Sequence, residues 1–500
     1  MQKAGAMSTR NGWKSLIAVL MMTLVMTFSV CAQENATAPA TGGTPVAAPG
    51  DTSAAEGAPD TAKPTGQEAS PASELAKPLT ELKLDTGDTA WVLASAALVL
   101  FMTPGLAFFY GGLVRGKNML NTLLMSFGAM AILPIIWMIA AYSIAFGDGG
   151  SANAYWGGLQ FLGLNGVDAS TAHSLAATIP HQAFMIFQMM FFIITPALIS
   201  GSLVERMKFS TYLVFIALWG LLVYAPVAHW VWGGGFIGAN IKALDFAGGA
   251  VVHVNAGFAA LAGALALGPR RGYNESSMRP HNLPFCLLGV GMLWFGWYGF
   301  NAGSALGGGS LAVVAFVNTT IGAAAAMLTW MLIDQITRKE ITALGAGTGA
   351  VAGLVGITPA CGFVTPMGAL LVGAITSCVC YVMATIRAKG PVDDSLDAFA
   401  VHGVGGFTGA VLTGLFSSAS LGAAAIGGSN VSPYAVAGGM GQVVKQIMGT
   451  GIVAIYTFVV SFILFKVLQA VMGLRATDES EQRGLDISLH GEEAYSEAAA

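Results

Sequence analysis

The chain has 500 residues, of which 55% are hydrophobic and only 10% are charged, and its formal net charge is −4. Soluble domains carry about 25% charged residues, so the composition excludes an ordinary soluble protein and indicates a membrane protein. The small net charge gives no indication of a nucleic-acid partner. The five cysteines show neither metal-ligand spacing nor a paired framework, so we expect them to be small core hydrophobes.

Residues 1–32 carry the pattern of a secretory signal peptide. Three basic residues precede the apolar run SLIAVLMMTLVMTFSV, and the small residues of VCAQ predict cleavage after Ala32. A lipoprotein site at Cys31 fits less well, because Val30 is bulky where a small residue is usual. Met7 remains an alternative start.

Residues 33–86 are dominated by Ala, Pro, Thr, Ser and Gly. Such a segment cannot bury enough apolar surface to fold, so we predict a disordered extracytoplasmic tether. Eleven apolar runs of spanning length follow, of which the eighth and tenth are short. They lie near residues 89–113, 119–146, 182–204, 211–231, 250–268, 282–303, 311–334, 344–358, 364–386, 397–416 and 441–472. The sequence thus predicts an all-α membrane domain of eleven transmembrane helices over residues 87–473, and a polar tail over residues 474–500.

The charges of the loops predict the orientation. Thirteen Lys and Arg residues fall in one set of alternating loops and in the tail, and Lys242 is the one clear basic residue of the opposite set. The thirteen are Arg115, Lys117, Arg206, Lys208, Arg270, Arg271, Arg279, Arg338, Lys339, Arg387, Lys389, Arg475 and Arg483. Basic loops face the cytoplasm. We therefore expect the N-terminus outside, the C-terminal tail in the cytoplasm, and the protein in the cytoplasmic (inner) membrane.

Two apolar stretches indicate an internal duplication. DFAGGAVVHVNAG places His253 in the fifth predicted span, and AFAVHGVGG places His402 in the tenth. Because five is an odd number, two five-span halves insert with opposite orientations. Inverted repeats of this kind place the substrate site between the halves, near the membrane midplane. The eleventh span has no counterpart and is predicted to be a peripheral helix.

A single histidine in a helix bundle is commonly satisfied by a neighbouring carbonyl, but ionisable residues within membrane spans mark functional sites. The two-fold axis of an inverted repeat would bring the rings of His253 and His402 together. Two imidazoles in contact cannot easily both be charged in an apolar site, so they titrate as a coupled pair. The matching positions therefore favour a functional pair.

Aromatic side chains recur at helical spacing in the predicted spans. They are Phe187 and Phe191 in the third, Trp232 at the end of the fourth, and Trp297 and Phe300, followed by Ser304, in the sixth. Most such stripes pack or face lipid. The glycine-rich surroundings and the hydroxyl at an outer helix end favour a cation–π cage, worth about 0.5–2 kcal/mol per ring.

Carboxylates lie at the ends of two spans. Asp245 precedes the fifth span, where it can cap the helix, attract a cation, or do both. Glu205 and Arg206 end the third span and are interpreted as a charge pair at a cytoplasmic helix end.

Six motifs in order resemble the Amt/Mep/Rh ammonium transporter family, and most closely its bacterial Amt members. They are LFMTPGLAFFYGGLVRGKNMLNTL, FQMMFFIITPALISGSLVERMKFS, DFAGGAVVHVNAG, GWYGFNAGSA, GLVGITPACGFV and VDDSLDAFAVHGVGG. The likeness runs from about Asp88 to Tyr495 and implies a homotrimer with one hydrophobic pore in each subunit. The long tether departs from compact members of the family and affects no pore residue.

The resemblance also implies roles for individual residues. The implied outer recruitment site consists of Phe187, Trp232 and Ser304, supported by Asp245. The implied gate consists of Phe191 and Phe300, and the implied pore is lined by His253, His402 and Trp297. The tail GLRATDESEQRGLDISLHGEEAY resembles the family's tail, whose cytoplasmic face receives PII-type regulators. The implied substrate is ammonium or ammonia, with methylammonium as an analogue, and no metal or cofactor is implied.

Other functions fit the sequence less well. An ammonium sensor on the same fold would typically append a cytoplasmic signalling domain, whereas a short tail follows Gly473. A sodium-coupled transporter should show titratable groups near the midplane besides the histidines. The sequence shows no nucleophile, metal cluster or carboxylate pair that would favour an enzyme. Whether ammonium transport is electrogenic stays open at this point.

Overall fold

The computed structural model describes residues 83–273, 278–419, 421 and 437–495. The predicted signal peptide, most of the predicted tether and the final residues of the tail lie outside the described residues. Asp85, at the end of the segment predicted as a tether, accepts a hydrogen bond from the N–H of Asp88. It thereby caps the first long helix, which begins at Thr86.

The described chain is almost entirely helical. Its first half contains α3 (Thr86–Leu113), α4 (Met119–Ile136), α5 (Tyr142–Phe146), β1 (Ala172–His173), β2 (Ala176–Pro180), α6 (His181–Ile199), α7 (Phe209–Trp219), α8 (Ala225–Val231), the π-helical turn η9 (Gly249–Val254) and α9 (Asn255–Leu267). The second half contains α10 (Leu283–Gly303), α11 (Ser310–Arg338), α12 (Ala343–Ile357), α13 (Pro366–Arg387), the π-helical turn η10 (Phe399–Val404) and α14 (Gly405–Phe416). The long α16 (Met440–Val471), the short α17 (Asp478–Arg483) and the π-helical turn η11 (Asp486–His490) follow.

Ten helices of the described chain are long and apolar enough to cross a membrane. They are Thr86–Leu113, Gly116–Phe146, His181–Ser202, Phe209–Val231, Gly249–Leu267, Leu283–Gly303, Ser310–Arg338, Pro366–Arg387, Phe399–Phe416 and Met440–Val471. The eighth predicted span forms α12, an apolar helix of 15 residues. It is shorter than the roughly 20 residues that an ordinary span needs.

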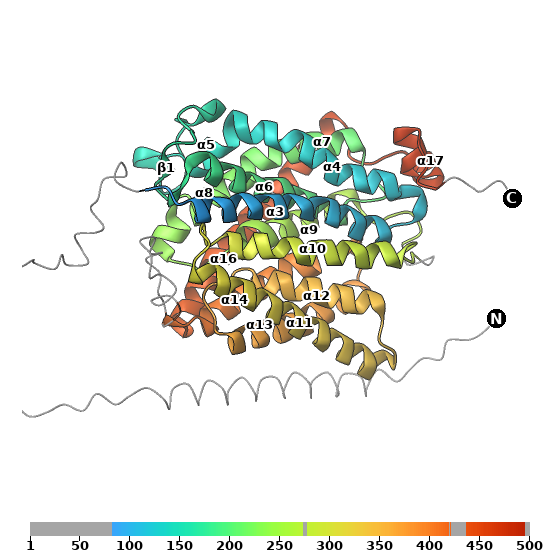
Figure 1. Cartoon of the computed structure of the whole chain (residues 1–500). Coiled ribbons are helices and arrows are strands. Elements are labelled where there is room, and N and C mark those ends of the chain that lie inside the picture. The colour runs from blue at the N-terminus through green and yellow to red at the C-terminus, as the bar shows by residue number, and fades with distance from the viewer. Residues whose placement is uncertain (1–82, 274–277, 420, 422–436, 496–500) are drawn as a thin grey trace, which may run out of the picture. The chain divides into compact units, whose positions relative to one another are not determined.

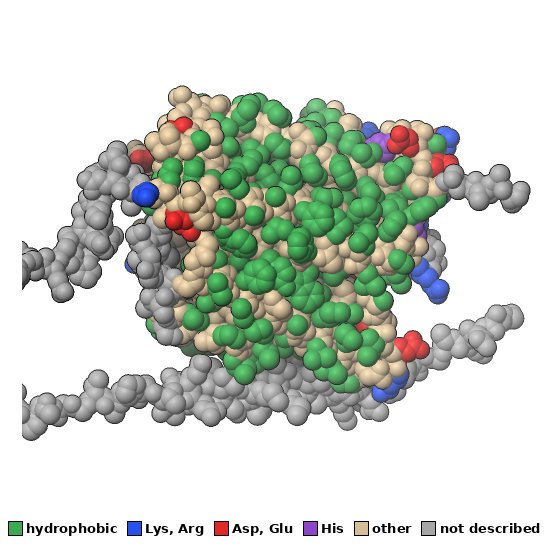
Figure 2. Space-filling model, in the orientation of Figure 1, with side chains coloured by type: hydrophobic (Ala, Val, Ile, Leu, Met, Phe, Trp, Pro, Cys, Tyr) green, Lys and Arg blue, Asp and Glu red, His purple; other side chains and the backbone are tan. Residues whose placement is uncertain are grey.

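The helices pack into one bundle in which they run along a common direction (Figure 1). The hairpin of β1 and β2 lies at one end of this bundle and α17 at the opposite end, so we call these the hairpin end and the tail end. Apolar side chains cover the middle of the visible face, whereas the charged side chains gather at the two ends (Figure 2). This distribution matches a multi-pass membrane protein, because lipid solvates apolar side chains and penalises charged ones.

The tail is held against the bundle. The carboxylate of Asp486 accepts the N–H groups of Leu120 and Asn121 at 3.0 and 2.8 Å, and so caps the first turn of α4. Arg475 forms an ion pair with Glu481. Residues 474–495 therefore belong to the tail end of the folded domain.

Candidate functional site

The two histidine-bearing helices begin in the same way. The carboxylate of Asp245 accepts four backbone N–H groups of the segment from Gly248 to Val251, at 2.6–3.1 Å. The carboxylate of Asp394 accepts three, from Ala398, Phe399 and Ala400. Each carboxylate lies eight residues before a histidine, and each histidine lies in a π-helical turn. The carboxylates satisfy N–H groups that have no partner within the helix.

Glycines let these two helices cross closely. A Cβ added to Gly257 would lie 2.1 Å from the backbone nitrogen of Gly403, and one added to Gly406 would lie 2.8 Å from the Cβ of His253. Each glycine stands four residues after its own histidine, on the same helix face. Any larger residue at either position would push the two helices apart and separate the histidines.

The crossing brings the two histidine rings into contact. Nδ1 of His402 lies 3.3 Å from Nδ1 of His253, and the ring centroids are 5.3 Å apart. Only one of these nitrogens can carry the shared proton, so the neutral rings adopt opposite tautomers. Nε2 of His253 is buried and has no hydrogen-bond partner. The pair therefore presents an unsatisfied polar atom in apolar surroundings.

Aromatic rings enclose this pair. His253 stacks on Trp297 and Phe300, with centroid distances of 5.4 and 5.9 Å. The indole N–H of Trp297 donates to the hydroxyl of Thr358 at 2.8 Å, which fixes the ring plane. A cavity of about 10 Å³ lies beside the two histidines, which is about the volume that one water molecule requires.

The predicted recruitment residues lie toward the hairpin end. Phe191 contacts three rings, with centroid distances of 5.0 Å to Phe187, 5.9 Å to Trp232 and 4.4 Å to Phe300. Phe187 and Phe191 are buried, whereas Trp232 and Ser304 are partly exposed. The rings of Phe191 and Phe300, tilted by 42° to each other, thus lie between Trp232 and His253.

Trp232 and Asp245 are directly linked. The indole N–H of Trp232 donates to the backbone carbonyl of Asp245 at 2.9 Å. The Ser304 hydroxyl donates to the Phe300 carbonyl at 2.8 Å, which leaves its oxygen free to accept. The hairpin-end site thus combines the partly exposed ring of Trp232 with the hydroxyl oxygen of Ser304, and the backbone of Asp245 orients that ring.

A larger cavity of about 440 Å³ approaches the histidines from the tail end. It shares Phe109, Val351 and His402 with the small cavity. Its rim includes Arg387 and Asp397, whose side chains form an ion pair. Burial raises the pKa of Asp397 to about 6, and the neighbouring Arg387 opposes that rise.

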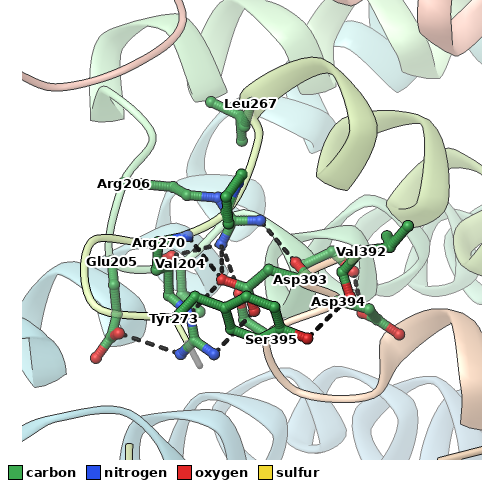
Figure 3. A network of polar contacts seen from close by, with 12 residues as sticks. Val204, Glu205, Arg206, Leu267, Arg270, Tyr273, Val392, Asp393, Asp394 and Ser395 are labelled. Atoms are coloured by element: carbon green, nitrogen blue, oxygen red, sulfur yellow. Dashed lines mark hydrogen bonds and ion pairs between the residues drawn. The ribbon is translucent and has the colours of Figure 1, made fainter. Parts of the chain in front are cut away.

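A buried network of charges lies at the tail end (Figure 3). Arg270 donates to both oxygens of Asp393, at 2.8 and 2.9 Å, and to Glu205 at 3.1 Å. Arg206 approaches Asp393, and Arg115 approaches Glu205. Burial opposes ionisation of Glu205 and Asp393, but the arginines outweigh it and lower the pKa of both carboxyl groups.

This network corrects one expectation. Glu205 and Arg206 do not pair with each other, as the sequence suggested, but with different partners. Glu205 adopts a positive φ of 68°, which turns consecutive side chains in different directions. The partners come from segments far apart in the chain, so sequence spacing could not reveal them.

Comparison with known proteins settles the family. The model of the Ammonium Transporter Family matches residues 90–495. The chain belongs to this family. The ammonium transporter of Bacillus subtilis (strain 168) is 46% identical over 416 residues, which are 83% of this chain and 100% of the relative. That of Aquifex aeolicus (strain VF5) is 47% identical over 421 residues, which are 83% of this chain and 94% of the relative.

Solved structures agree with this assignment. The crystal structure of Saccharomyces cerevisiae Mep2 matches with a TM-score of 0.77 and 34% identity, over 85% of this chain and 95% of that one. The expected resemblance to the Amt/Mep/Rh family is therefore confirmed. The relatives are named as transporters, which points away from an enzyme.

Several residues of the site escaped the sequence analysis. They are Asp394, Gly257, Gly406, Thr358 and the ion pair of Arg387 and Asp397 at the larger cavity. The first three could have been found, because Asp245 and Asp394, like Gly257 and Gly406, are separated by the same interval of 149 residues as the two histidines. The other three carry no signal in the sequence alone.

Proposed function

We propose that this protein takes up ammonium across the cytoplasmic membrane. Ammonium is captured among Phe187, Trp232 and Ser304, with Asp245 attracting the cation. It gives up a proton to the external water at this partly exposed site, and ammonia then passes the gate of Phe191 and Phe300 and moves along the pore. The pore is lined by His253, His402 and Trp297.

The observation that carries this proposal is the histidine pair in its dry setting. Ammonium and potassium are similar in size, so a ring of carbonyls would separate them poorly. Ammonium can shed a proton and cross an apolar pore as ammonia, whereas potassium cannot. Moving a bare ion into such a pore costs far more free energy than moving a neutral amine. The free Nε2 of His253 offers that amine a polar contact.

The proposed membrane topology has eleven crossings, with α12 as the eighth. The basic ends of α11 and α13, at Arg338 and Arg387, both belong to the predicted cytoplasmic set. A helix between them must cross back, and α12 connects them. An odd number of crossings puts the two ends of the domain on opposite sides, and the basic loops favour the tail end in the cytoplasm and the hairpin end outside.

Two inverted repeats of five helices complete the proposed architecture, with α16 outside them. The matching carboxylates, histidines and glycines support this symmetry. We further propose a homotrimer and a cytoplasmic PII-type regulator that docks at the tail end, where residues 474–495 lie. The cleaved signal peptide and the tether remain part of the proposal.

The names of the relatives do not favour the alternative of an ammonium sensor with little transport. Uptake of methylammonium by a strain without its own ammonium transporters tests transport directly. Currents in proteoliposomes then compare ammonium with potassium. We expect uptake and an ammonium-dependent response with potassium excluded. A folded protein that carries neither methylammonium nor ammonium would contradict the proposal.

A further inference from the structure

Two glutamines near the start of α16 hold the loop that leads to the hairpin-end site. We call Gln442 and Gln446 the glutamine clamp. Oε1 of Gln446 accepts the N–H of Leu244 at 2.5 Å, and its Nε2 donates to the carbonyl of Leu244 at 2.7 Å. Gln446 is fully buried. Its amide thus binds both main-chain groups of one residue, as a neighbouring β-strand would.

The same amide reaches the second half of the bundle. Nε2 of Gln446 also donates to the carbonyl of Ala410 in α14, at 3.0 Å. Gln442 donates to the carbonyl of Lys242 at 2.9 Å and to Oε1 of Gln446 at 3.2 Å. Lys242 has a positive φ of 61°, a conformation that a non-glycine residue holds only when its surroundings fix it. The clamp therefore joins α16, the loop and α14 at one point.

The clamped loop leads directly into the site. Asp245 follows Leu244 in the chain, and its carbonyl accepts the indole N–H of Trp232. The same residue's carboxylate holds the first turn of η9. A shift of Leu244 would therefore move the acceptor that orients the Trp232 ring.

We propose that the glutamine clamp positions the hairpin-end site: Gln446 fixes the main chain of Leu244, and through Asp245 it fixes the ring of Trp232. It thereby sets the affinity for ammonium without touching the substrate. This inference rests on the proposed recruitment role of Trp232. It gives the eleventh helix, which carries no part of the repeat, a function in the transport site.

The test separates affinity from rate. Gln446→Leu keeps the side chain's size and removes its donors and acceptors. The half-saturation concentration for methylammonium uptake should rise by about threefold to tenfold, as partial loss of one cation–π contact would cause. The maximal rate and the exclusion of potassium should stay unchanged, because the histidine pair is untouched. Gln446→Glu, which retains an acceptor for the N–H of Leu244, should show a smaller rise.

A double-mutant cycle distinguishes positioning from a general loss of stability. Gln446→Leu combined with Trp232→Leu should be no worse than Trp232→Leu alone, because both changes act through one ring. The matched control is Ser461→Ala, which removes another buried bond of α16, the one from the Trp219 indole at 2.9 Å. This control should leave the half-saturation concentration unchanged.

Each outcome has a defined meaning. If Trp232→Leu leaves the half-saturation concentration unchanged, the recruitment role of Trp232 is wrong, and the positioning role of Gln446, which depends on it, is wrong as well. If Trp232→Leu raises it and folded Gln446→Leu does not, the positioning role alone is overturned. Additive effects, or an equal rise in Ser461→Ala, also overturn it. Where Gln446→Leu does not fold, Gln442→Leu serves in its place, and a normal half-saturation concentration in that variant overturns the clamp.

Discussion

The turns η9 and η10 are built alike but have different electrostatic surroundings. Each is capped by a carboxylate eight residues before a histidine. Among the ion pairs of the described residues, none involves Asp245 at the hairpin end. Beside Asp394 at the tail end, Asp393 is paired with Arg206 and Arg270.

The pKa of Asp245 and those of the arginine-paired carboxyl groups Glu205 and Asp393 shift in opposite directions. Burial raises the pKa of Asp245, even though four backbone N–H groups oppose the rise. The pKa values of Glu205 and Asp393 are lowered, because arginines outweigh the effect of burial. Both histidine-bearing turns are thus capped by a carboxylate at the same distance along the chain. Arginines neutralise Glu205 and Asp393, whereas no ion pair of the described residues neutralises Asp245.

The largest expected effect comes from breaking the network at the tail end. Arg270→Met leaves Glu205 and Asp393 without their shared partner, and breaking a buried ion pair costs about 3–5 kcal/mol. We expect a much lower melting temperature or no folded protein in detergent. Lys242→Met, an exposed change at the hairpin end, should alter stability by no more than about 0.5 kcal/mol. Equal melting temperatures for both variants would remove the proposed difference between the ends.

The same network predicts a dependence on pH. The folded-state pKa values of Glu205 and Asp393 are lowered, so their contribution to stability is present above the unfolded pKa and is lost as the pH falls through the folded pKa. Melting temperatures of the wild type should therefore drop in acid. The drop should be smaller for Arg270→Met. If the variant shows the same acid dependence, other carboxyl groups cause it.

An intermediate effect is expected from neutralising each cap in turn. Asp245→Asn should raise the half-saturation concentration for methylammonium several-fold, because it removes the negative charge proposed to attract the cation. Asp394→Asn should leave that concentration unchanged and cost little stability, because Asn keeps an accepting oxygen and caps a helix about as well as Asp. Uptake at varied concentration, with both variants at matched expression, makes the comparison. An equal rise of the half-saturation concentration in both variants would mean that both carboxylates act only as helix caps.

The smallest effect is expected in the tail. Asp486→Ala removes the cap of α4 and should cost about 0.5–2 kcal/mol without changing the half-saturation concentration. Thermal unfolding measures the first quantity and uptake the second. A transport defect in this variant would show that the tail acts on the pore as well as on the stability of α4.

The sequence predicted the helices better than the contacts among their ends. The apolar runs located the long helices of the described residues, because a membrane span needs a minimum apolar length. The matching surroundings of His253 and His402 predicted the contact between their rings. The partners of Glu205 and Arg206 could not be predicted, because they depend on loops that fold back from distant segments. The role of Gln446 could not be predicted either, because its partners are backbone atoms, which leave no pattern in the sequence.

We propose that His253 and His402 share a proton and make the pore selective. Replacing one leaves the other ring without its partner, and an unsatisfied buried polar group costs about 1–3 kcal/mol, which a large bundle can survive. The decisive measurement is ammonium and potassium current in proteoliposomes with folded His253→Leu, His402→Leu and the double variant. Each should lose ammonium transport or admit potassium, and the double variant should be little worse than either single one. Wild-type ammonium current with potassium still excluded in folded His253→Leu would contradict the claim.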